Sequence, residues 1–486
     1  MHYKDKKRSR ALLLIVGQAL ESLRRSFDKV ILDEVFSSLQ LVLDTLEQEI
    51  NLPSLTIDSI QDLMTLLRDA SSKNGAVPGT VSNLFQDLLN KFDQEVEARV
   101  KVAFFPYKAS MWDSLESIYL AAAKDPACDV SVVPIPYYTL SENGAESHYE
   151  GDLFPSSIPI THYSLYDLET ERPDIIYVHN IYDEYNIITR VHEDYFTSNL
   201  KKYTDLLVYV PYCLVSFRKP KPQDSSTKIL FGLPSFANVD KVVVQGRYYL
   251  DMALSLGIRK EKILALGSPK IDRLVTAFEG EYRLPGDWEE KIRGKTVFLF
   301  DTHMLHFSSG NVFKKLEMMV KILNTPNVVD NSVLIWRPHP LLLSTLRKTN
   351  PLLADYYLDL TERVGKNEYS NVIFDDNVDF LPALAAADVY IGKSSSLMNG
   401  FMLKGKPIVL ISGFRPESYV KNGMFYSLVV KDSSWINILR EAAEKSKTKD
   451  PQKVKLAQKA WYNVDGTSGE KIHEAAKNEL LSLCSI

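Results

Sequence analysis

From Lys101 onward, short apolar runs alternate with amphipathic stretches, and this alternation occurs twice along the chain. A short apolar run suits a strand buried in a parallel sheet, and the amphipathic stretch that follows suits a helix covering that sheet. Successive strand–helix units build an open, mostly parallel sheet. The pattern therefore predicts an α/β fold with two Rossmann-like domains.

The first alternation predicts strands at 102–105, 130–135, 175–178, 206–210, 241–244 and 263–266. The second predicts strands at 297–300, 333–336, 372–374, 389–391, 408–411 and 428–430. Between them, residues 280–294 are rich in glycine, proline and charge, which is typical of a linker. We expect a first domain at 99–285 and a second at 286–486 that includes the C-terminal helices.

Residues 1–98 are expected to be helical, because apolar residues recur at helical spacing in three stretches around 12–23, 31–46 and 85–92. The simplest interpretation is a small bundle or packing arm without chemistry. A basic cluster at 4–10 precedes an apolar run that is too short for a signal peptide and lacks a cleavage pattern. Weak peripheral contact with an anionic membrane surface is the alternative for this cluster.

Composition narrows the class of protein. The three cysteines, at 128, 213 and 484, form no Cys-x-x-Cys pair, so neither a zinc ribbon nor a disulfide framework is indicated. The net charge of −5 gives no general attraction to nucleic acid. No stretch reaches the length needed to span a bilayer. We expect a cytoplasmic protein, with contact at the inner face of the cell membrane as the alternative.

Two facing Rossmann-like domains place the carboxyl ends of their strands on opposite sides of a cleft, where ligands bind. The segment Trp336-Arg337-Pro338-His339-Pro340 ends a strand at such an edge, and its two prolines stiffen the turn. A guanidinium group beside an imidazole suits the oxygens of a diphosphate. Alternatively, Arg337 pairs with an acidic neighbour and His339 packs at the turn.

A second candidate site follows the strand at 389–391. Lys393 and the three serines Ser394, Ser395 and Ser396 lead into a helix expected at 397–404. Free N–H groups, hydroxyls and the positive end of the helix dipole make such a start an anion site, and Lys393 adds a cation. The alternative is ordinary helix capping.

On the first-domain side, the strand at 175–178 delivers His179 to the cleft edge, followed by the polar residues Asn180, Asp183 and Glu184. An imidazole with a carboxylate in reach can act as a general base towards a hydroxyl. The alternative is hydrogen bonding that only shapes the turn.

The first strand-to-helix turn carries Lys108, Ser110 and Asp113 but lacks Gly-x-Gly-x-x-Gly, which disfavours dinucleotide binding. It either lines an acceptor site or is a plain turn. His303 and His306 follow the first strand of the second domain and can reach the cleft. A metal site is not favoured there, because no acidic third ligand is evident.

Taken together, the motifs between residues 101 and 415 resemble the CDP-glycerol glycerophosphotransferase family of teichoic-acid-type polymerases and primases. The matching stretches are VAFFPYKASMWDSL at 102–115, PIPYY at 134–138, HYEGD at 148–152, HN at 179–180, YDEYN at 182–186, LGSPK at 266–270, WRPHP at 336–340, DD at 375–376 and GKP at 405–407, with the strand-to-serine turn before it.

This resemblance implies a fold similar to GT-B glycosyltransferases. It implies transfer of glycerol phosphate from CDP-glycerol to a hydroxyl-bearing acceptor, lipid-linked or not, in cell-surface polymer synthesis, with release of CMP and without a bound metal or other cofactor. Arg337, His339, Ser395 and Ser396 would hold the donor phosphates. His179, with His339, would be the catalytic candidate, and Asp376 would lie at the cleft.

Two residues depart from the family pattern. Lys393 stands where the family has an acidic residue, and His303 stands where a small hydroxyl residue is expected. The reversed charge at Lys393 is compatible with tighter phosphate binding, with a changed donor or with lost activity. Two further hypotheses therefore stay open: a GT-B enzyme that transfers or epimerises a nucleotide sugar, and a non-catalytic nucleotide-binding or scaffold protein of the same fold.

Overall fold

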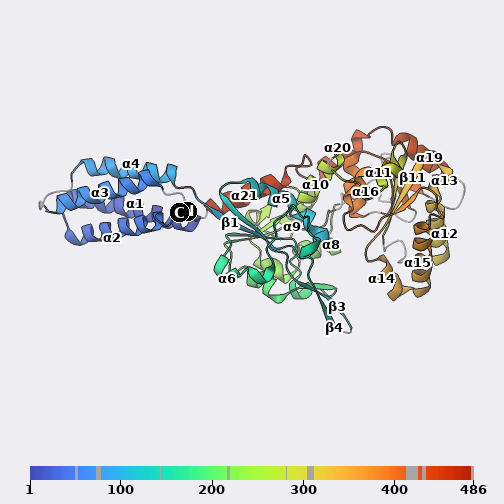
Figure 1. Ribbon diagram of the computed structural model, residues 1–486, viewed down its shortest axis with the longest axis horizontal. Coiled ribbons are helices and arrows are strands. Elements are labelled where there is room, and N and C mark those ends of the chain that lie inside the picture. Colours follow the sequence, from blue (N-terminus) through green and yellow to red (C-terminus); the bar gives the residue numbers. More distant parts are fainter. Residues whose placement is uncertain are drawn as a thin grey trace.

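The computed structural model describes residues 1–49, 53–72, 78–142, 144–215, 219–280, 282–303, 311–393, 395–411, 425–428 and 434–482. A helical bundle and two α/β units follow one another along the longest axis of the molecule (Figure 1). Among the described helices, none is both long and apolar enough to cross a bilayer.

The described residues of the N-terminal bundle form the helices α1 (Tyr3–Arg25), α2 (Lys29–Leu46), α3 (Ser54–Ser72) and α4 (Thr80–Glu95). Each contributes fully buried apolar side chains to one separate core, among them Leu13, Leu39, Leu63 and Leu88. None of the three expected helical stretches covers α3, which begins directly after Pro53. Part of the basic cluster is paired within the protein, since Lys4 contacts Asp205 and Arg10 contacts Asp93.

The first large sheet has the strand order β2-β1-β5-β7-β8-β9 and is parallel throughout. Its strands are β1 (Val100–Phe104), β2 (Cys128–Val132), β5 (Ile175–Val178), β7 (Leu206–Tyr209), β8 (Lys241–Val243) and β9 (Ile263–Leu264). The order reverses between β1 and β5, so their carboxyl ends border a crevice.

The second large sheet has the order β12-β11-β10-β13-β14-β15 and is also parallel. Its strands are β10 (Thr296–Thr302), β11 (Ser332–Pro338), β12 (Val372–Phe374), β13 (Val389–Gly392), β14 (Ile408–Ile411) and β15 (Phe425–Leu428). This is the doubly wound order, with its switch point between β10 and β13. The two sheets confirm the predicted fold class, a GT-B-like pair of Rossmann-like domains. Of the strand expected at 428–430, only Leu428 is among the described residues.

Helices cover both large sheets. They are α5 (Glu116–Lys124), α6 (Leu168–Glu171), α7 (Thr197–Leu200), α8 (Ser225–Phe231), α9 (Arg247–Ser255), α10 (Pro269–Phe278), α11 (Trp288–Ile292), α12 (Val312–Leu323), α13 (Thr325–Val328), α14 (Leu342–Thr349), α15 (Pro351–Gly365), α16 (Leu381–Ala386), α17 (Ser396–Phe401), α19 (Ser434–Lys445), α20 (Pro451–Ala460) and α21 (Ser468–Ser482). After β1, the 3-10 turn η1 (Ala109–Ser114) precedes α5.

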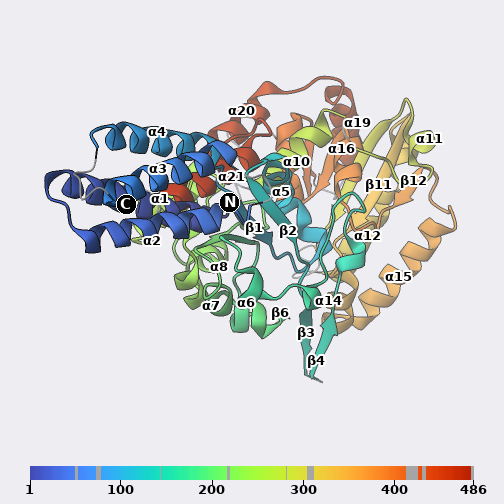
Figure 2. The ribbon, with the colours of Figure 1, turned by 60° about the vertical axis from the view of Figure 1, so that its left-hand side comes forward.

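A small antiparallel sheet, unforeseen in the sequence, has the order β4-β3-β6. It consists of β3 (Tyr137–Ser141), β4 (Gly144–His148) and β6 (Thr189–Val191). Its β3–β4 hairpin extends away from the first domain (Figures 1 and 2). β4 lacks an apolar face, since its first four residues are exposed, so no hydrophobic pattern marked it.

The C-terminal helix returns to the first domain. α21 lies beside α5 (Figures 1 and 2), and its fully buried Ile472, Ala476 and Leu480 join the core around β1 and β5. Asp272 on α10 accepts hydrogen bonds from Ser468 N (3.0 Å) and Gly469 N (2.7 Å) at the start of α21. The expected assignment of all C-terminal helices to the second domain is therefore wrong for α21, because its partners in packing come from the first.

Candidate functional site

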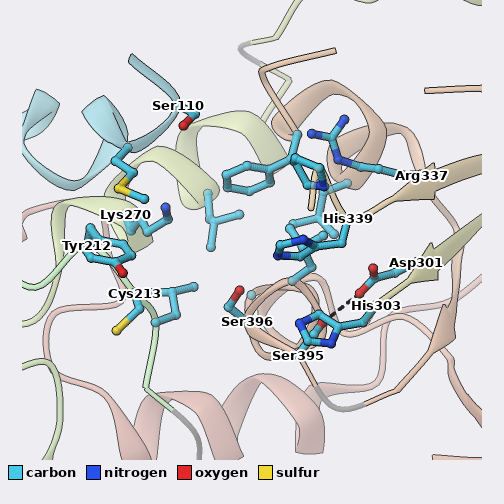
Figure 3. A pocket seen from close by; sticks show the side chains of 18 of the residues that line it. Ser110, Tyr212, Cys213, Lys270, Asp301, His303, Arg337, His339, Ser395 and Ser396 are labelled. Carbon is cyan, nitrogen blue, oxygen red and sulfur yellow. Dashed lines mark hydrogen bonds between the residues drawn. The ribbon is translucent and has the colours of Figure 1, made fainter. Parts of the chain in front are cut away.

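A cavity of about 270 Å³ lies between the carboxyl ends of the two large sheets. Its first-domain wall includes Ser110, Met111, Tyr212, Cys213, Leu214, Lys270 and Leu274. Its second-domain wall includes Asp301, His303, Arg337, Pro338, His339, Pro340, Ser395, Ser396 and Leu397. Figure 3 shows these two sets of side chains facing one another. The cavity thus occupies the cleft that facing Rossmann-like domains were expected to form.

His339 projects into this cavity from the turn after β11. The turn is held in place because His339 N donates to Thr302 O at the end of β10 (3.0 Å). His339 Nδ1 accepts from Leu341 N (3.1 Å), which leaves the ring proton of the neutral imidazole on Nε2. Burial, with His303 and Arg337 nearby, lowers the pKa of His339 to about 4. At neutral pH this side chain is therefore an uncharged hydrogen-bond donor.

Arg337 borders the cavity, but its guanidinium group is engaged with the protein. It donates to Asp375 Oδ2 (2.5 Å), to Asn377 O (2.9 Å) and to Asp379 O (3.4 Å). This is the alternative that the sequence left open, in which the arginine pairs with an acidic neighbour. Arg337 therefore fixes the loop after β12 against the turn that carries His339, and both of its terminal nitrogens donate to that loop.

Asp301, at the end of β10, is a buried carboxylate in the cavity wall. Its Oδ2 accepts from Tyr390 Oη (2.5 Å) and from Ser395 Oγ (2.9 Å). Burial raises the pKa of Asp301, while the hydrogen bonds and the neighbouring His303 and Arg337 oppose that rise. The cavity wall thus contains an acidic residue that was not among the expected cleft residues.

The serine turn serves two purposes. Ser395 Oγ also accepts from Met398 N (3.1 Å), so Ser395 is the N-cap of α17. Ser396 is exposed in the cavity wall, and its hydroxyl lies near His339 in Figure 3.

Lys393 is not among the residues lining the cavity, and burial lowers its pKa. Ser394 and His306 lie outside the described residues.

Lys270 is the cation on the first-domain side. Its Nζ is 2.9 Å from Asp113 Oδ1, and both side chains are nearly buried, with exposures of 12% and 11%. Asp113 therefore lies behind Lys270, and its other oxygen has no hydrogen-bond partner among the described residues. Burial raises the pKa of Asp113. The Lys270 ammonium group faces the cavity opposite Ser396 and His339 (Figure 3).

His179 is fully buried beneath η1 and does not line the cavity. Its Nε2 accepts from Tyr107 N (3.3 Å), and its Nδ1 lies 3.1 Å from Ser114 Oγ. Burial lowers the pKa of His179 to about 3. A neutral ring with both nitrogens engaged inside the protein is not placed to take a proton from a ligand, which corrects its expected role as base. The structure gives it the alternative role of shaping the turn.

The polar residues after His179 also shape the protein. Asn180 Oδ1 accepts from Tyr182 N (2.8 Å), and Asp183 accepts from Thr197 N and Oγ1 (3.0 and 2.6 Å). None of the remaining expected cleft residues lines the cavity: Lys108, Asp113, Asn180, Asp183, Glu184 and Asp376. Glu184 and Asp376 are exposed.

Sequence reasoning missed Asp301 and Lys270. Asp301 is the first polar residue after the apolar run 297–300, near the end of a strand at a switch point, which is the signal that could have identified it. Lys270 belongs to the recognised LGSPK stretch, but nothing in a linear motif shows that α10 turns this lysine towards the opposite domain.

No protein-family model and no curated protein matches the chain. Solved structures do. A UDP-N-acetylglucosamine 2-epimerase, so described, from Listeria monocytogenes is 16% identical over 79% of this chain and 98% of its own, with a TM-score of 0.51. The wall teichoic acid polymerase TagF is 12% identical over 88% of this chain and 99% of its own, with a TM-score of 0.48. The UDP-GlcNAc 2-epimerase of Methanocaldococcus jannaschii is 15% identical over 78% of this chain and 99% of its own, with a TM-score of 0.48. At such identities the likeness concerns the fold alone.

Proposed function

We propose that this chain transfers glycerol phosphate, or a related alditol phosphate, from a CDP-activated donor to a hydroxyl acceptor and releases CMP. The observation that carries the proposal is the convergence of Lys270, His339 and Ser396 on one cavity between the two switch points. The family resemblance of the WRPHP, LGSPK and serine-turn motifs supports the choice of a CDP-alcohol as donor. We also propose that the two domains comprise residues 99–285 and 286–486, except that α21 packs on the first domain.

In this proposal the donor diphosphate lies between the two domains. His339 donates from Nε2, Ser396 donates from Oγ, and Lys270 supplies positive charge from the opposite wall. Donors that are fixed before the ligand arrives stabilise phosphate charge without reorganisation at the moment of reaction. Arg337 and Ser395, expected to touch the phosphates, instead hold the His339 turn and the start of α17 in place.

The reaction needs a base, and we assign this role to His303. Its ring centre lies 5.0 Å from that of His339, on the same cavity wall. The acceptor oxygen attacks the phosphorus of the glycerol phosphate group, the bond from that phosphorus to the CMP oxygen breaks, and the acceptor proton passes to the imidazole. Positioning and electrostatic stabilisation supply the rest of the acceleration.

The test is release of CMP from CDP-glycerol by the purified chain in the presence of a glycerol-phosphate-terminated acceptor. His339→Gln and Ser396→Ala each remove a donor to developing charge, so kcat/KM is expected to fall by about 10²–10³-fold. Ser37→Ala, an exposed serine of α2, is the matched control and should leave the rate unchanged. Full turnover in His339→Gln and Ser396→Ala would reject this site.

A nucleotide sugar is the second candidate donor, and one observation favours it. Asp301 and His303 place a carboxylate and an imidazole together in the cavity, a pairing suited to moving protons on a sugar, and His303 is a departure from the polymerase pattern. Thermal shifts with CDP-glycerol, CDP-ribitol, CTP and UDP-sugars separate the candidates, because the bound ligand raises the melting temperature. Nucleotide binding without release of CMP or change of a sugar would indicate a binding protein.

A further inference from the structure

Asp125, Cys128 and His473 meet where the C-terminal helix crosses the start of β2. Asp125 and Cys128 flank the turn between α5 and β2, and His473 comes from α21, 345 residues further along the chain than Cys128. One potential ligand atom from each residue lies within 4.8 Å of the other two. Cys128 and His473 are buried, and Asp125 is half-buried.

The three side chains are arranged around a common point and not in a chain that could relay a proton. His473 Nε2 lies 3.8 Å from Cys128 Sγ and 3.1 Å from Asp125 Oδ2. A nucleophilic cysteine assisted by histidine and aspartate needs the thiol at one ring nitrogen and the carboxylate at the other. Here both face the same nitrogen, and Nδ1 has no hydrogen-bond partner in the part of the chain that the structure describes. The three groups therefore surround a point between them.

That point suits a zinc ion. With bonds of about 2.3 Å to sulfur and about 2.0 Å to nitrogen and oxygen, tetrahedral Zn²⁺ holds sulfur and nitrogen about 3.5 Å apart and nitrogen and oxygen about 3.3 Å apart. The observed separations are 3.8 and 3.1 Å. A thiolate, an imidazole and a carboxylate are ligands that zinc accepts.

A cavity adjoins the cluster on one side. It is lined by Asp125 and His473 together with the acidic Glu470 and Glu474, whereas Cys128 is not part of its wall. A metal held by the three ligands would therefore have the sulfur behind it and a fourth position open towards the cavity, for water or a small anion. Lys477 Nζ is 2.6 Å from Asp125 Oδ2 and competes with a cation for that oxygen.

We propose that Asp125, Cys128 and His473 form a zinc site that clamps α21 to the first Rossmann-like domain. The site joins the turn before β2 to a helix that returns from the second domain, so zinc binding stabilises this return of the chain. The proposal does not depend on the reaction at the interdomain cavity.

Metal binding is measured on the full chain after dialysis against a chelator, with Co²⁺ as the spectroscopic probe and Zn²⁺ as the competitor. One equivalent of Co²⁺ should bind and give a thiolate-to-cobalt charge-transfer band that Zn²⁺ abolishes. Cys128→Ser should remove the band, and Cys213→Ser, the matched thiol control, should keep it. His473→Gln should weaken Zn²⁺ binding by about tenfold or more.

Lys477→Met gives a result that misfolding cannot imitate, because this variant is expected to bind Zn²⁺ more tightly than the wild type. Removing the competing ammonium group should tighten Zn²⁺ binding several-fold and raise the melting temperature in excess Zn²⁺. The site is refuted if Co²⁺ gives no thiolate band with the wild-type chain, or if Cys128→Ser retains it. It is likewise refuted if Lys477→Met binds Zn²⁺ no more tightly, which would leave the cluster as an ion pair beside an inert thiol.

Discussion

At the residue scale, the same side-chain type has different roles in different surroundings. His179 and His339 both follow a strand, and both have a pKa below the usual histidine range. His179 is covered by η1 and engaged at both nitrogens, whereas His339 has one nitrogen directed to the cavity. Sequence identified both positions correctly as strand ends. It could not show which imidazole other parts of the chain would bury.

Asp183 allows a test of stability against pH. Burial raises its pKa to about 6, above the value of an unfolded aspartate, so the folded state binds the proton more tightly. Stability should therefore fall as pH rises from 4 to 6, by at most about 3 kcal/mol, and then level off. Asp183→Asn should lack this fall, and it suits the backbone because φ is 46°. Chemical denaturation of both proteins at pH 4, 5, 6 and 7 is the measurement, and parallel profiles would contradict the assignment.

Asp301 allows a test of the proposed phosphate site. Burial raises the pKa of Asp301, so the test is made at pH 8, which favours the ionised form. An ionised carboxylate opposes a diphosphate in the same cavity, so Asp301→Asn should tighten binding of CDP-glycerol by about tenfold, or 1.4 kcal/mol. The amide oxygen still accepts from Tyr390 or Ser395. Calorimetric titration measures the change, with the exposed Asp376→Asn as control. Equal affinity in wild type and Asp301→Asn would show that the diphosphate does not approach this carboxylate.

At the element scale, the long-range position of α21 is the feature that the chain order concealed. Its apolar residues show helical spacing, but the same stripe could pack on either sheet. The choice depends on Asp272, which caps the helix from α10, and on a close approach between α21 and α5. A Cβ added at Gly469 would lie 2.3 Å from the backbone carbon of Ser117.

Gly469→Ala should therefore destabilise the protein by about 1–3 kcal/mol, because the backbone of α5 cannot yield as a flexible side chain would. Gly365→Ala is the control, since no atom of a described residue lies within 4 Å of a Cβ there and it closes α15. This control should be neutral or stabilise by up to about 1 kcal/mol. Urea unfolding measures the stability of both variants, and equal midpoints would contradict the packing of α21 against α5.

At the scale of the whole molecule, the bundle and the two α/β domains differ in how they are joined. The core of the bundle is separate, whereas one apolar core includes residues from both large sheets and from α10, α16 and α17. Leu274 of α10 lies against Gly400 of α17, 2.8 Å from a Cβ built there. The cleft therefore has a well-packed base, while none of the bundle's described residues lines the cavity.

Phe92→Ala tests this separation. Phe92 is fully buried in the bundle core, so its truncation should destabilise the bundle by about 3–5 kcal/mol. Nucleotide binding at the interdomain cavity should be unchanged. Scanning calorimetry should show an early transition for the bundle, and titration with CDP-glycerol should give the wild-type affinity. A single transition with lost nucleotide binding would show that the bundle supports the cleft.

The sequence by itself determined the local structure of the two α/β domains. The strands Ile175–Val178, Val372–Phe374 and Ile408–Ile411 have the expected bounds, because a strand buried on both faces must be apolar along its length. It also placed Arg337, His339 and the serine turn at strand ends. Local pattern is enough for this, since strand–helix alternation requires only neighbouring residues.

The tertiary structure decided which of these side chains share a site. Arg337 pairs with Asp375, and His179 is buried. Lys270 and Asp301 reach the cavity from elements far apart in the chain. The same holds for α21 and for the meeting of Asp125, Cys128 and His473. Such contacts depend on which surfaces pack together, and packing is a property of the assembled elements that no single stretch of sequence contains.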